Sequence, residues 1–353
     1  MPNWGFVWMV AWPDFRVRLV RFVIIGFGMA LVLAITLLLS AFSEGFKLRS
    51  ERLLDVFGGD RYLIAEGSAG PMTSTTPLPG ELVDLVESQG MTALPLVLTP
   101  NAVAVDGAPA GVIVVGASGS EPGLTLTDGR WFEQPGEAIV DAELVELSLG
   151  DDFILAGRPM TVVGTTEHVT WDIATAGLII DQQEALDIFA DGADIVTAVA
   201  FSGDQPITGL PPGVVEVDRA SAFDDVLSRT ADAKRSIDSF KMTLWVLAVV
   251  IVAAVLYLAA IDRVRDFAVF KATGASNTDL VVGLSLQAVF VGLIAGVLSI
   301  GLAHVMKPVY PGLLSLPLSV AWTVVPVAVV ISVVSSLFGV RRAINADPSQ
   351  AFG

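Results

Sequence analysis

The chain has 353 residues, of which 53% are hydrophobic and 16% are charged, and its mean hydropathy is +0.69. Its net charge is −17, and it contains no cysteine. The lack of cysteine excludes disulfide bonds, thiolate metal sites and cysteine nucleophiles, and the acidic balance argues against nucleic-acid binding. Hydrophobicity this high is typical of a membrane protein.

The first predicted element is a short amphipathic helix over residues 1–21. Trp4, Trp8 and Trp12 precede Arg16 and Arg18 along this segment. Aromatic and basic side chains favour the boundary between lipid and water, so we expect the helix to lie along the inner leaflet.

Four stretches without a charged residue are long enough to cross a bilayer, which takes about 20 apolar residues. They are Phe22–Ser43, Met242–Ile261, Leu280–Ala303 and Leu318–Val340. Buried core helices are the alternative, as is a signal peptide for the first stretch, but the length of the runs favours four retained spans. The predicted arrangement is one span, a large polar block, and three further spans.

Basic residues cluster in three segments: before the first span, between the second and third, and after the fourth. Acidic residues are concentrated in the polar block instead. Lys and Arg near span ends mark the cytoplasmic side, and four spans place all three basic segments on that side. The sequence therefore predicts cytoplasmic termini in a plasma-membrane protein, with the polar block outside.

The polar block is predicted to be an α+β domain over residues 58–220, carried on helical stalks. The first span and its stalk are expected to form one helix over residues 22–57 that stops at Gly58-Gly59. The second stalk and the second span are expected over residues 221–261, with an unbroken stalk helix from Ser221 to Ile237. The domain's predicted strands are Arg61–Ala65, Ala102–Val105, Val112–Val115, Ala138–Asp141, Phe153–Ala156, Met160–Val163 and Ala176–Ile180. Helices are expected over Pro79–Gln89, Ala142–Leu149 and Gln182–Phe189, and Asp106-Gly107 is expected to turn a hairpin.

Enzyme motifs are missing from the sequence. There are two histidines, His168 and His304, and no H-E-x-x-H, G-x-S-x-G or P-loop pattern. We therefore predict no catalytic residues, no metal site and no intrinsic cofactor.

The segment between the second and third spans, residues 262–279, reads as an amphipathic helix that ends at Gly274. It presents Phe267 and Phe270 beside Arg265 and Asp266. Such a helix can receive force from a cytoplasmic partner, and a helix that simply rests on lipid headgroups is the alternative.

Three motifs resemble those of the permease subunits of type VII ABC transporters, the MacB/FtsX family. The first is Arg263-Val264-Arg265-Asp266-Phe267-Ala268-Val269-Phe270-Lys271-Ala272-Thr273-Gly274-Ala275, similar to R-x-x-E-(I/F)-(A/G)-x-x-(K/R)-A-(L/I)-G-A, with Asp266 where the family has Glu. The second runs from Gly129-Arg130-Trp131-Phe132 through Ala138-Ile139-Val140 and Leu149-Gly150 to Met160-Thr161-Val162-Val163-Gly164. The third is the tail over 341–353, where Arg341, Ala343, Pro348, Ala351 and Phe352 match R-x-A-x-x-x-x-P-x-x-A-(L/F).

The resemblance implies a homodimer in the lipid bilayer that binds two copies of a separate cytoplasmic ABC ATPase. The residues expected to couple to the ATPase are Arg263, Arg265, Asp266, Phe267, Phe270, Lys271 and Gly274. ATP hydrolysis then belongs to the partner, and movement is passed to the outer domain through the stalks (mechanotransmission). The spans 280–303 and 318–340 complete the bundle, and Gly292-x-x-x-Gly296 in the third permits close helix packing.

The family's compact members include haem exporters (HrtB-like) and DevC-like glycolipid exporters, so we expect export of a hydrophobic or amphiphilic compound, with haem as the leading candidate. The predicted substrate-binding residues are Phe42, Glu44, Phe46, Phe240 and Met242, at the outer ends of the first two spans. Glu and Met can ligate iron and Phe can stack on a planar ring; as interfacial anchors of two helices, the same residues would bind nothing. The alternatives are an FtsX-like regulator of a cell-wall hydrolase that transports nothing, and a permease for glycolipid, lipoprotein or drug export.

Overall fold

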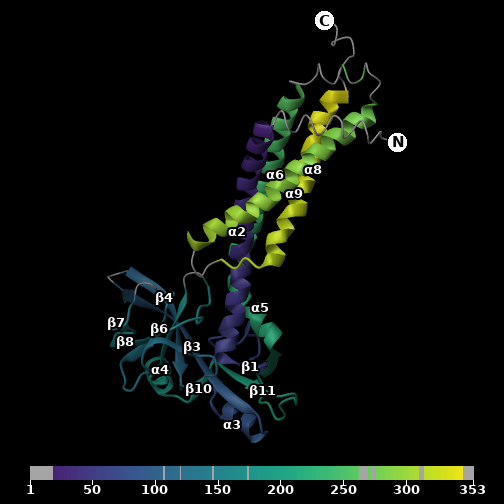
Figure 1. The fold of residues 1–353 in the computed structure, drawn as a ribbon. Coiled ribbons are helices and arrows are strands. Elements are labelled where there is room, and N and C mark those ends of the chain that lie inside the picture. The colour runs from purple at the N-terminus through teal and green to yellow at the C-terminus, as the bar shows by residue number, and fades with distance from the viewer. Residues whose placement is uncertain are drawn as a thin grey trace. The chain divides into compact units, whose positions relative to one another are not determined.

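The structure is a computed structural model, which describes residues 19–105, 108–119, 121–144, 147–172, 175–261, 269, 271, 276–309 and 314–344. The chain divides into two compact units. The first comprises residues 1–45 and 233–353, and the second comprises residues 46–232. Figure 1 shows the long helices of the first unit and the strands of the second.

Four long helices make up the described part of the first unit. They are α2 (Leu19–Phe57), α6 (Ala231–Ile261), α8 (Asn277–Met306) and α9 (Leu318–Ile344), and a short 3₁₀ turn, η1 (Lys307–Val309), follows α8. Each contains a segment long and apolar enough to cross a membrane. Their shared core includes Met29 and Leu33 from α2, Val252 from α6, Ala295 from α8 and Ala328 from α9. The prediction of one span followed by three is confirmed.

The second unit is an α+β domain, as predicted. Its strands are β1 (Arg61–Ala65), β2 (Leu78–Pro79), β3 (Thr92–Val105), β4 (Ala108–Ala117), β5 (Leu126–Gly129), β6 (Glu137–Asp141), β7 (Asp152–Leu155), β8 (Arg158–Thr166), β9 (Ala176–Asp181), β10 (Ile195–Val196), β11 (Ala198–Ser202) and β12 (Val214–Asp218). Its helices are α3 (Glu81–Ser88), α4 (Gln182–Phe189) and α5 (Arg219–Arg229), together with the last turns of α2. All seven strands and two of the three helices expected from the sequence are present, with shifted ends.

Six of the strands close into a barrel. Going around it, β3 pairs with β4, β4 with β9, β9 with β6, β6 with β8, β8 with β7, and β7 again with β3 through Ala104 and Ile154. The β4–β9 and β6–β8 pairs are parallel and the others are antiparallel. From β3 the sheet continues outward through β11 and β1 to β12.

The barrel strands are buried on both faces. Val112 and Val114 of β4 belong to one hydrophobic cluster, whereas Ile113 and Val115 belong to another. Successive side chains of a strand point to opposite faces, so this alternation means that each face has its own core. This double burial explains why β4 and β6 read in the sequence as continuous apolar runs.

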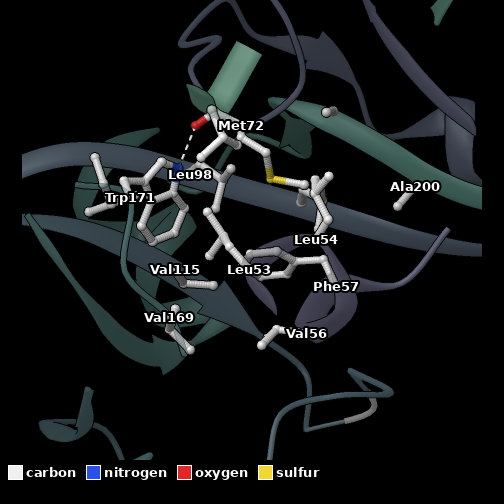
Figure 2. Close-up of a cluster of buried hydrophobic side chains, with 14 of the residues drawn as sticks. Leu53, Leu54, Val56, Phe57, Met72, Leu98, Val115, Val169, Trp171 and Ala200 are labelled. Atoms are coloured by element: carbon white, nitrogen blue, oxygen red, sulfur yellow. Dashed lines mark hydrogen bonds between the residues drawn. The ribbon is translucent and has the colours of Figure 1, made fainter. Parts of the chain in front are cut away.

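The end of α2 forms part of the core on the outer face of the barrel. Leu53, Leu54, Val56 and Phe57 are each at most 3% exposed and pack with residues of β3, β4, β9 and α5. Figure 2 shows these four side chains beside Leu98 of β3 and Val115 of β4. Gly58, at a φ of 66°, donates its amide to the Leu54 carbonyl over 2.9 Å and stops the helix. The predicted stop at Gly58-Gly59 is confirmed.

The helix predicted over Ala142–Leu149 is wrong: the described residues of this range form turns and irregular backbone. Their backbone amides are taken by other acceptors. Ala142 donates to the Thr166 carbonyl over 2.8 Å, and Glu143 donates to the buried Asp141 carboxylate over 2.8 Å. The Asp141 carboxylate also accepts from the Val169 amide over 2.6 Å, so this segment is tied to the residues that follow β8, and Leu144 and Leu147 are buried from short turns instead of from a helix.

The single stalk helix predicted from Ser221 to Ile237 is interrupted. Helix α5 ends at Arg229 and α6 begins at Ala231. Between them, Thr230 donates both its amide and its hydroxyl to the Leu227 carbonyl, over 3.0 and 2.9 Å. A threonine hydroxyl that competes for a helix carbonyl favours such a break.

Other predictions lie outside the described residues. They are most of the interfacial helix over 1–21, the turn residues Asp106-Gly107, most of the segment 262–279, and the tail beyond Ile344. The two strands beside Asp106-Gly107 do pair as a hairpin, with Val105 opposite Ala108.

Candidate functional site

Most of the predicted coupling segment lies outside the described residues. Arg263, Arg265, Asp266, Phe267, Phe270 and Gly274 are in that part. Val269 and Lys271 are described, and both are helical; Val269 is 45% exposed and Lys271 is partly buried. The contact of this segment with an ATPase stays a prediction.

The predicted substrate residues on α2 differ in exposure. Phe42 and Glu44 are partly buried, and Phe46 is 4% exposed. Glu44 has an interaction partner within the structure, as do Phe42, Phe46 and Lys47. A carboxylate that already has a partner does not need a ligand to offset the cost of lying near hydrocarbon, so the case for Glu44 as an iron ligand rests on chemistry alone.

The predicted substrate residues on α6 are highly exposed. Phe240 is 64% exposed and Met242 is 67% exposed. Much of the α6 span resembles them: Trp245, Val246, Leu247, Val250, Ile251, Tyr257, Leu258 and Ile261 are also exposed. Of the four candidate spans, α6 is the least covered by its own chain, so its apolar surface is available to lipid or to another protein chain.

Helices α8 and α9 pack closely through two glycines, as the sequence predicted. A Cβ atom on Gly292 would lie 2.8 Å from Ser332 Oγ and 2.9 Å from Val329 Cα. A Cβ on Gly296 would lie 3.0 Å from Val325 Cα. Only glycine permits the two backbones to approach so closely, so these helices form a tight pair.

In the second unit, a buried acid joins α5 to the segment that precedes β2. Asp225, 4% exposed, accepts hydrogen bonds from the Met72 amide at 2.9 Å and the Thr73 amide at 3.1 Å, and from the Thr73 hydroxyl. Burial raises the pKa of Asp225, and these hydrogen bonds oppose that rise. The Met72 carbonyl in turn accepts from Trp171 Nε1 over 2.8 Å (Figure 2).

These contacts place Met72 between α5, which precedes α6, and the end of α2. The Trp171 ring packs against Phe57 with centroids 6.2 Å apart, which completes a cluster around the end of α2. Farther along α2, Arg49 forms a 2.9 Å ion pair with Glu143, whose pKa is raised by burial. Helix α2 is therefore fixed in the second unit by both apolar and ionic contacts.

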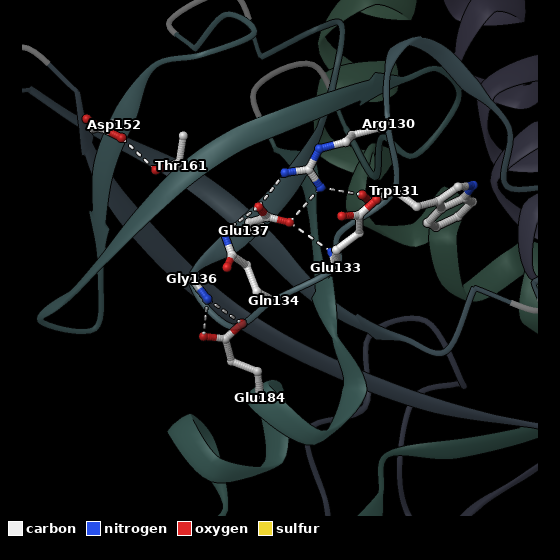
Figure 3. A network of polar contacts seen from close by, with 9 residues as sticks. All are labelled: Arg130, Trp131, Glu133, Gln134, Gly136, Glu137, Asp152, Thr161 and Glu184. Carbon is white, nitrogen blue, oxygen red and sulfur yellow. Dashed lines mark hydrogen bonds and ion pairs between the residues drawn. The ribbon is translucent and has the colours of Figure 1, made fainter.

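The family-like motif that begins at Gly129 forms a polar network (Figure 3). The Arg130 guanidinium donates to both carboxylate oxygens of Glu137, at 2.7 and 2.5 Å, and the Glu133 amide donates to the same carboxylate at 2.8 Å. The hydrogen bonds from Arg130 lower the pKa of Glu137 to about 2. Beside it, Glu184 of α4 accepts from the Gly136 amide at 2.9 Å. The network fixes the segment between β5 and β6.

Gly129 itself is required by the backbone. Its φ is 77°, and a Cβ atom there would meet the Val163 carbonyl and lie 2.8 Å from Gly164 Cα. Sequence reasoning found this motif only through its resemblance to a family. It missed the roles of Asp141 and Asp225, because nothing in the local sequence distinguishes a buried acid from a solvated one.

Comparison with known proteins gives three findings. Residues 240–348 match the model of the FtsX-like permease C-terminal family. The chain is 32% identical over 343 residues to "Uncharacterized ABC transporter permease Rv2563" of Mycobacterium tuberculosis and to Mb2592 of Mycobacterium bovis, covering 96% of this chain and 97% of each relative. It is 31% identical over 344 residues to the M. tuberculosis permease Rv0072, with the same coverage.

Two solved structures are distant neighbours. The extracellular domain of the transporter YknZ from Gram-positive bacteria is 14% identical and covers 41% of this chain and 83% of its own, with a TM-score of 0.32. The periplasmic region of MacB from Actinobacillus actinomycetemcomitans is 13% identical, covers 54% and 94%, and has the same TM-score of 0.32. On its similarity to the full-length relatives, the chain belongs to the MacB/FtsX-like family of ABC transporter permeases.

Proposed function

We propose that this permease exports a hydrophobic or amphiphilic compound by passing force from a cytoplasmic ATPase to its second unit. The observation that supports the proposal most directly is the continuity of α2. This helix runs without a break from its membrane span to Phe57, and its last turns are part of the core of the second unit. A helix built into a folded core can move that core as one body.

The proposal places the second unit outside the cytoplasm and both termini inside. Counted along the sequence, residues 46–232 carry 30 acidic and 8 basic side chains, whereas the remainder carries 7 acidic and 12 basic ones. This asymmetry agrees with the rule that Lys and Arg gather on the cytoplasmic side.

Since the chain has no cysteine, the orientation can be tested with Asp106→Cys and Ser276→Cys made separately. An impermeant maleimide applied to intact cells should label position 106 and spare position 276. Labelling of 276 alone would reverse the orientation.

The energy source is proposed to be two copies of a separate ABC ATPase bound to a permease homodimer. The exposed apolar surface of α6 supports dimerisation, because a second copy would cover side chains that this chain leaves open. Phe267→Asp and Phe270→Asp should abolish stimulation of ATP hydrolysis by the permease while leaving expression and dimerisation intact. Unchanged stimulation in both variants would remove residues 262–279 from the ATPase contact.

The substrate is proposed to be haem, held between the outer ends of the first two spans. Haemin added to the purified permease should give a specific shift of the Soret band. Glu44→Ala and Met242→Ala should each weaken the shift, because these residues are the proposed iron ligands. No shift in the parent protein would remove haem from consideration, and a shift unchanged in both variants would place the site elsewhere.

A second candidate is a regulator of a cell-wall hydrolase that transports nothing. It is favoured by the burial of Phe46 and by the partner of Glu44, which leave fewer free groups for a ligand. Purified permease with its ATPase should be screened for compounds that stimulate ATP hydrolysis. Stimulation by a soluble hydrolase, with none by haemin, glycolipids, lipoproteins or drugs, would favour the regulator.

A further inference from the structure

The α8–α9 pair contacts the other two spans partly through serine hydroxyls. Ser332 and Ser335 are three residues apart on α9, so they face the same side of the helix, and both are at most 1% exposed. Ser332 Oγ donates to Met29 Sδ of α2 over 3.5 Å. Ser335 Oγ donates to the Val249 carbonyl of α6 over 3.1 Å. The pair made rigid by Gly292 and Gly296 therefore carries a polar contact to each neighbouring span.

The contact to α6 is formed where that helix is least exposed. Among the described side chains of the span Met242–Ile261, the buried ones are Ala248, Val252 and Ala253, which lie around Val249. Val246 and Val250 of the same helix, in contrast, are more than half exposed. Among the side chains that the structure describes, α6 thus meets the bundle through Ala248, Val252 and Ala253, beside the Ser335 hydrogen bond.

We propose that Ser335 is a positioning residue, whose hydrogen bond to Val249 fixes the point about which α6 pivots on the α8–α9 pair. The proposal rests on the proposed function, in which force applied near residues 262–279 travels along α6. A pivot needs a contact that holds the helix at one place along its length. Small side chains let the helices approach closely but carry no polar group, so the Ser335 hydroxyl adds a directional contact at one residue of α6.

Neighbouring Ser336 provides a matched control. It is also buried, at 4% exposure, but its hydroxyl donates to the Val333 carbonyl of its own helix over 2.7 Å. Ser335→Ala and Ser336→Ala therefore remove the same group from adjacent sites, and only the first removes a contact between helices. Hydrogen bonds between membrane helices are weak, so we expect Ser335→Ala to change the population of α6 positions about threefold, and by about twentyfold at most.

The test measures distances between α6 and α9 in the full-length permease bound to its ATPase in lipid nanodiscs. Spin labels go on Met242→Cys and Leu318→Cys, which are 67% and 68% exposed, in a chain with no other cysteine. Without nucleotide, Ser335→Ala should enlarge the minor distance population about threefold, and Ser336→Ala should match the parent. The melting temperatures of the two variants should agree.

Identical distance distributions in parent, Ser335→Ala and Ser336→Ala would overturn the proposal. So would a lower melting temperature for Ser335→Ala with unchanged distances, because that result describes a structural contact only. Repeating the measurement with a non-hydrolysable ATP analogue tests the proposed function separately. If the parent does not respond to the analogue, ATP-driven movement fails, while the nucleotide-free comparison still decides the role of Ser335.

Discussion

Truncation of Phe57 tests whether the end of α2 is a structural part of the second unit. Phe57 is 1% exposed and packs against Trp171, and Phe57→Ala would remove the ring from a closed cluster. Removing a buried phenylalanine ring costs about 3–5 kcal/mol, since apolar contact is lost and a cavity is left. Against a total stability of about 5–15 kcal/mol for a domain, this is a large loss.

The assay is hydrogen exchange of the full-length permease, read at backbone amides of β4 and β9. Amides that exchange through global unfolding of the unit should exchange roughly a hundred- to a few-thousandfold faster in Phe57→Ala. Leu149→Ala is the control, because Leu149 is 45% exposed and its truncation should change stability by about 0.5 kcal/mol or less. If Phe57→Ala exchanged like Leu149→Ala, α2 would not be anchored in this core, and the mechanical argument built on it would fail.

Three further predictions concern packing, charge and buried amides. Gly292→Ala should lower the stability of the spans to thermal unfolding by about 1–3 kcal/mol, because the added methyl group would overpack against Ser332. Gly283→Ala is the control and should be neutral or stabilising, because its added Cβ would have no atom within 4 Å. Equal effects of the two changes would contradict the close approach of α8 and α9. The pKa of Glu137 is lowered from 4.5 to about 2, so the stabilisation by its carboxylate is complete above about pH 4.5 and is lost as the pH falls towards 2. In acid titrations, the difference in unfolding free energy between the parent and Glu137→Gln should shrink over that range. A difference that does not change with pH would refute the ionised Glu137–Arg130 pair. Asp225→Ala leaves the amides of Met72 and Thr73 without their acceptor, and each lost hydrogen bond should lower the stability by about 1–3 kcal/mol. Limited proteolysis should therefore cut residues 66–77 faster than in the parent. Unaltered cleavage would mean that other contacts hold this segment.

Local signals predicted the elements whose stabilising contacts are local. Helix α4 begins and ends as the sequence indicated, and Asp181 caps it by accepting from the amides of Gln183 and Glu184. The stop after α2 was equally readable, because glycine is the residue that tolerates the left-handed conformation at Gly58. Long uncharged runs gave the four spans.

Features that depend on distant residues were not predicted. The apolar segment after Asp141 has helical spacing, but its first amide donates to the Thr166 carbonyl, and Asp141 also accepts from the amide of distant Val169. The strands β11 (Ala198–Ser202) and β12 (Val214–Asp218) were missed, and both are defined by pairing with distant strands: β11 with β1 and β3, and β12 with β1. Closure of the barrel joins Ala104 to Ile154, which no local pattern encodes.

The candidate site was predictable only as a set of residue types at span ends. Side-chain chemistry identified Phe46 and Met242 equally, yet Phe46 is buried and Met242 is two-thirds exposed. Burial depends on which helix face meets the rest of the fold, and an uncharged span gives little periodic signal of its orientation.

The core around the end of α2 is built from residues far apart in the sequence, which determines when the second unit can fold. Leu53 and Phe57 are packed with Ala198, Ala222 and Val226, which are synthesised about 140–170 residues later. Because the chain is synthesised from its N-terminus, the end of α2 leaves the ribosome long before the strands and the helix that cover it. Contacts this far apart in sequence form slowly, so the end of α2 remains uncovered until those elements have been synthesised. The core of the second unit can therefore close only after the chain has been synthesised as far as α5.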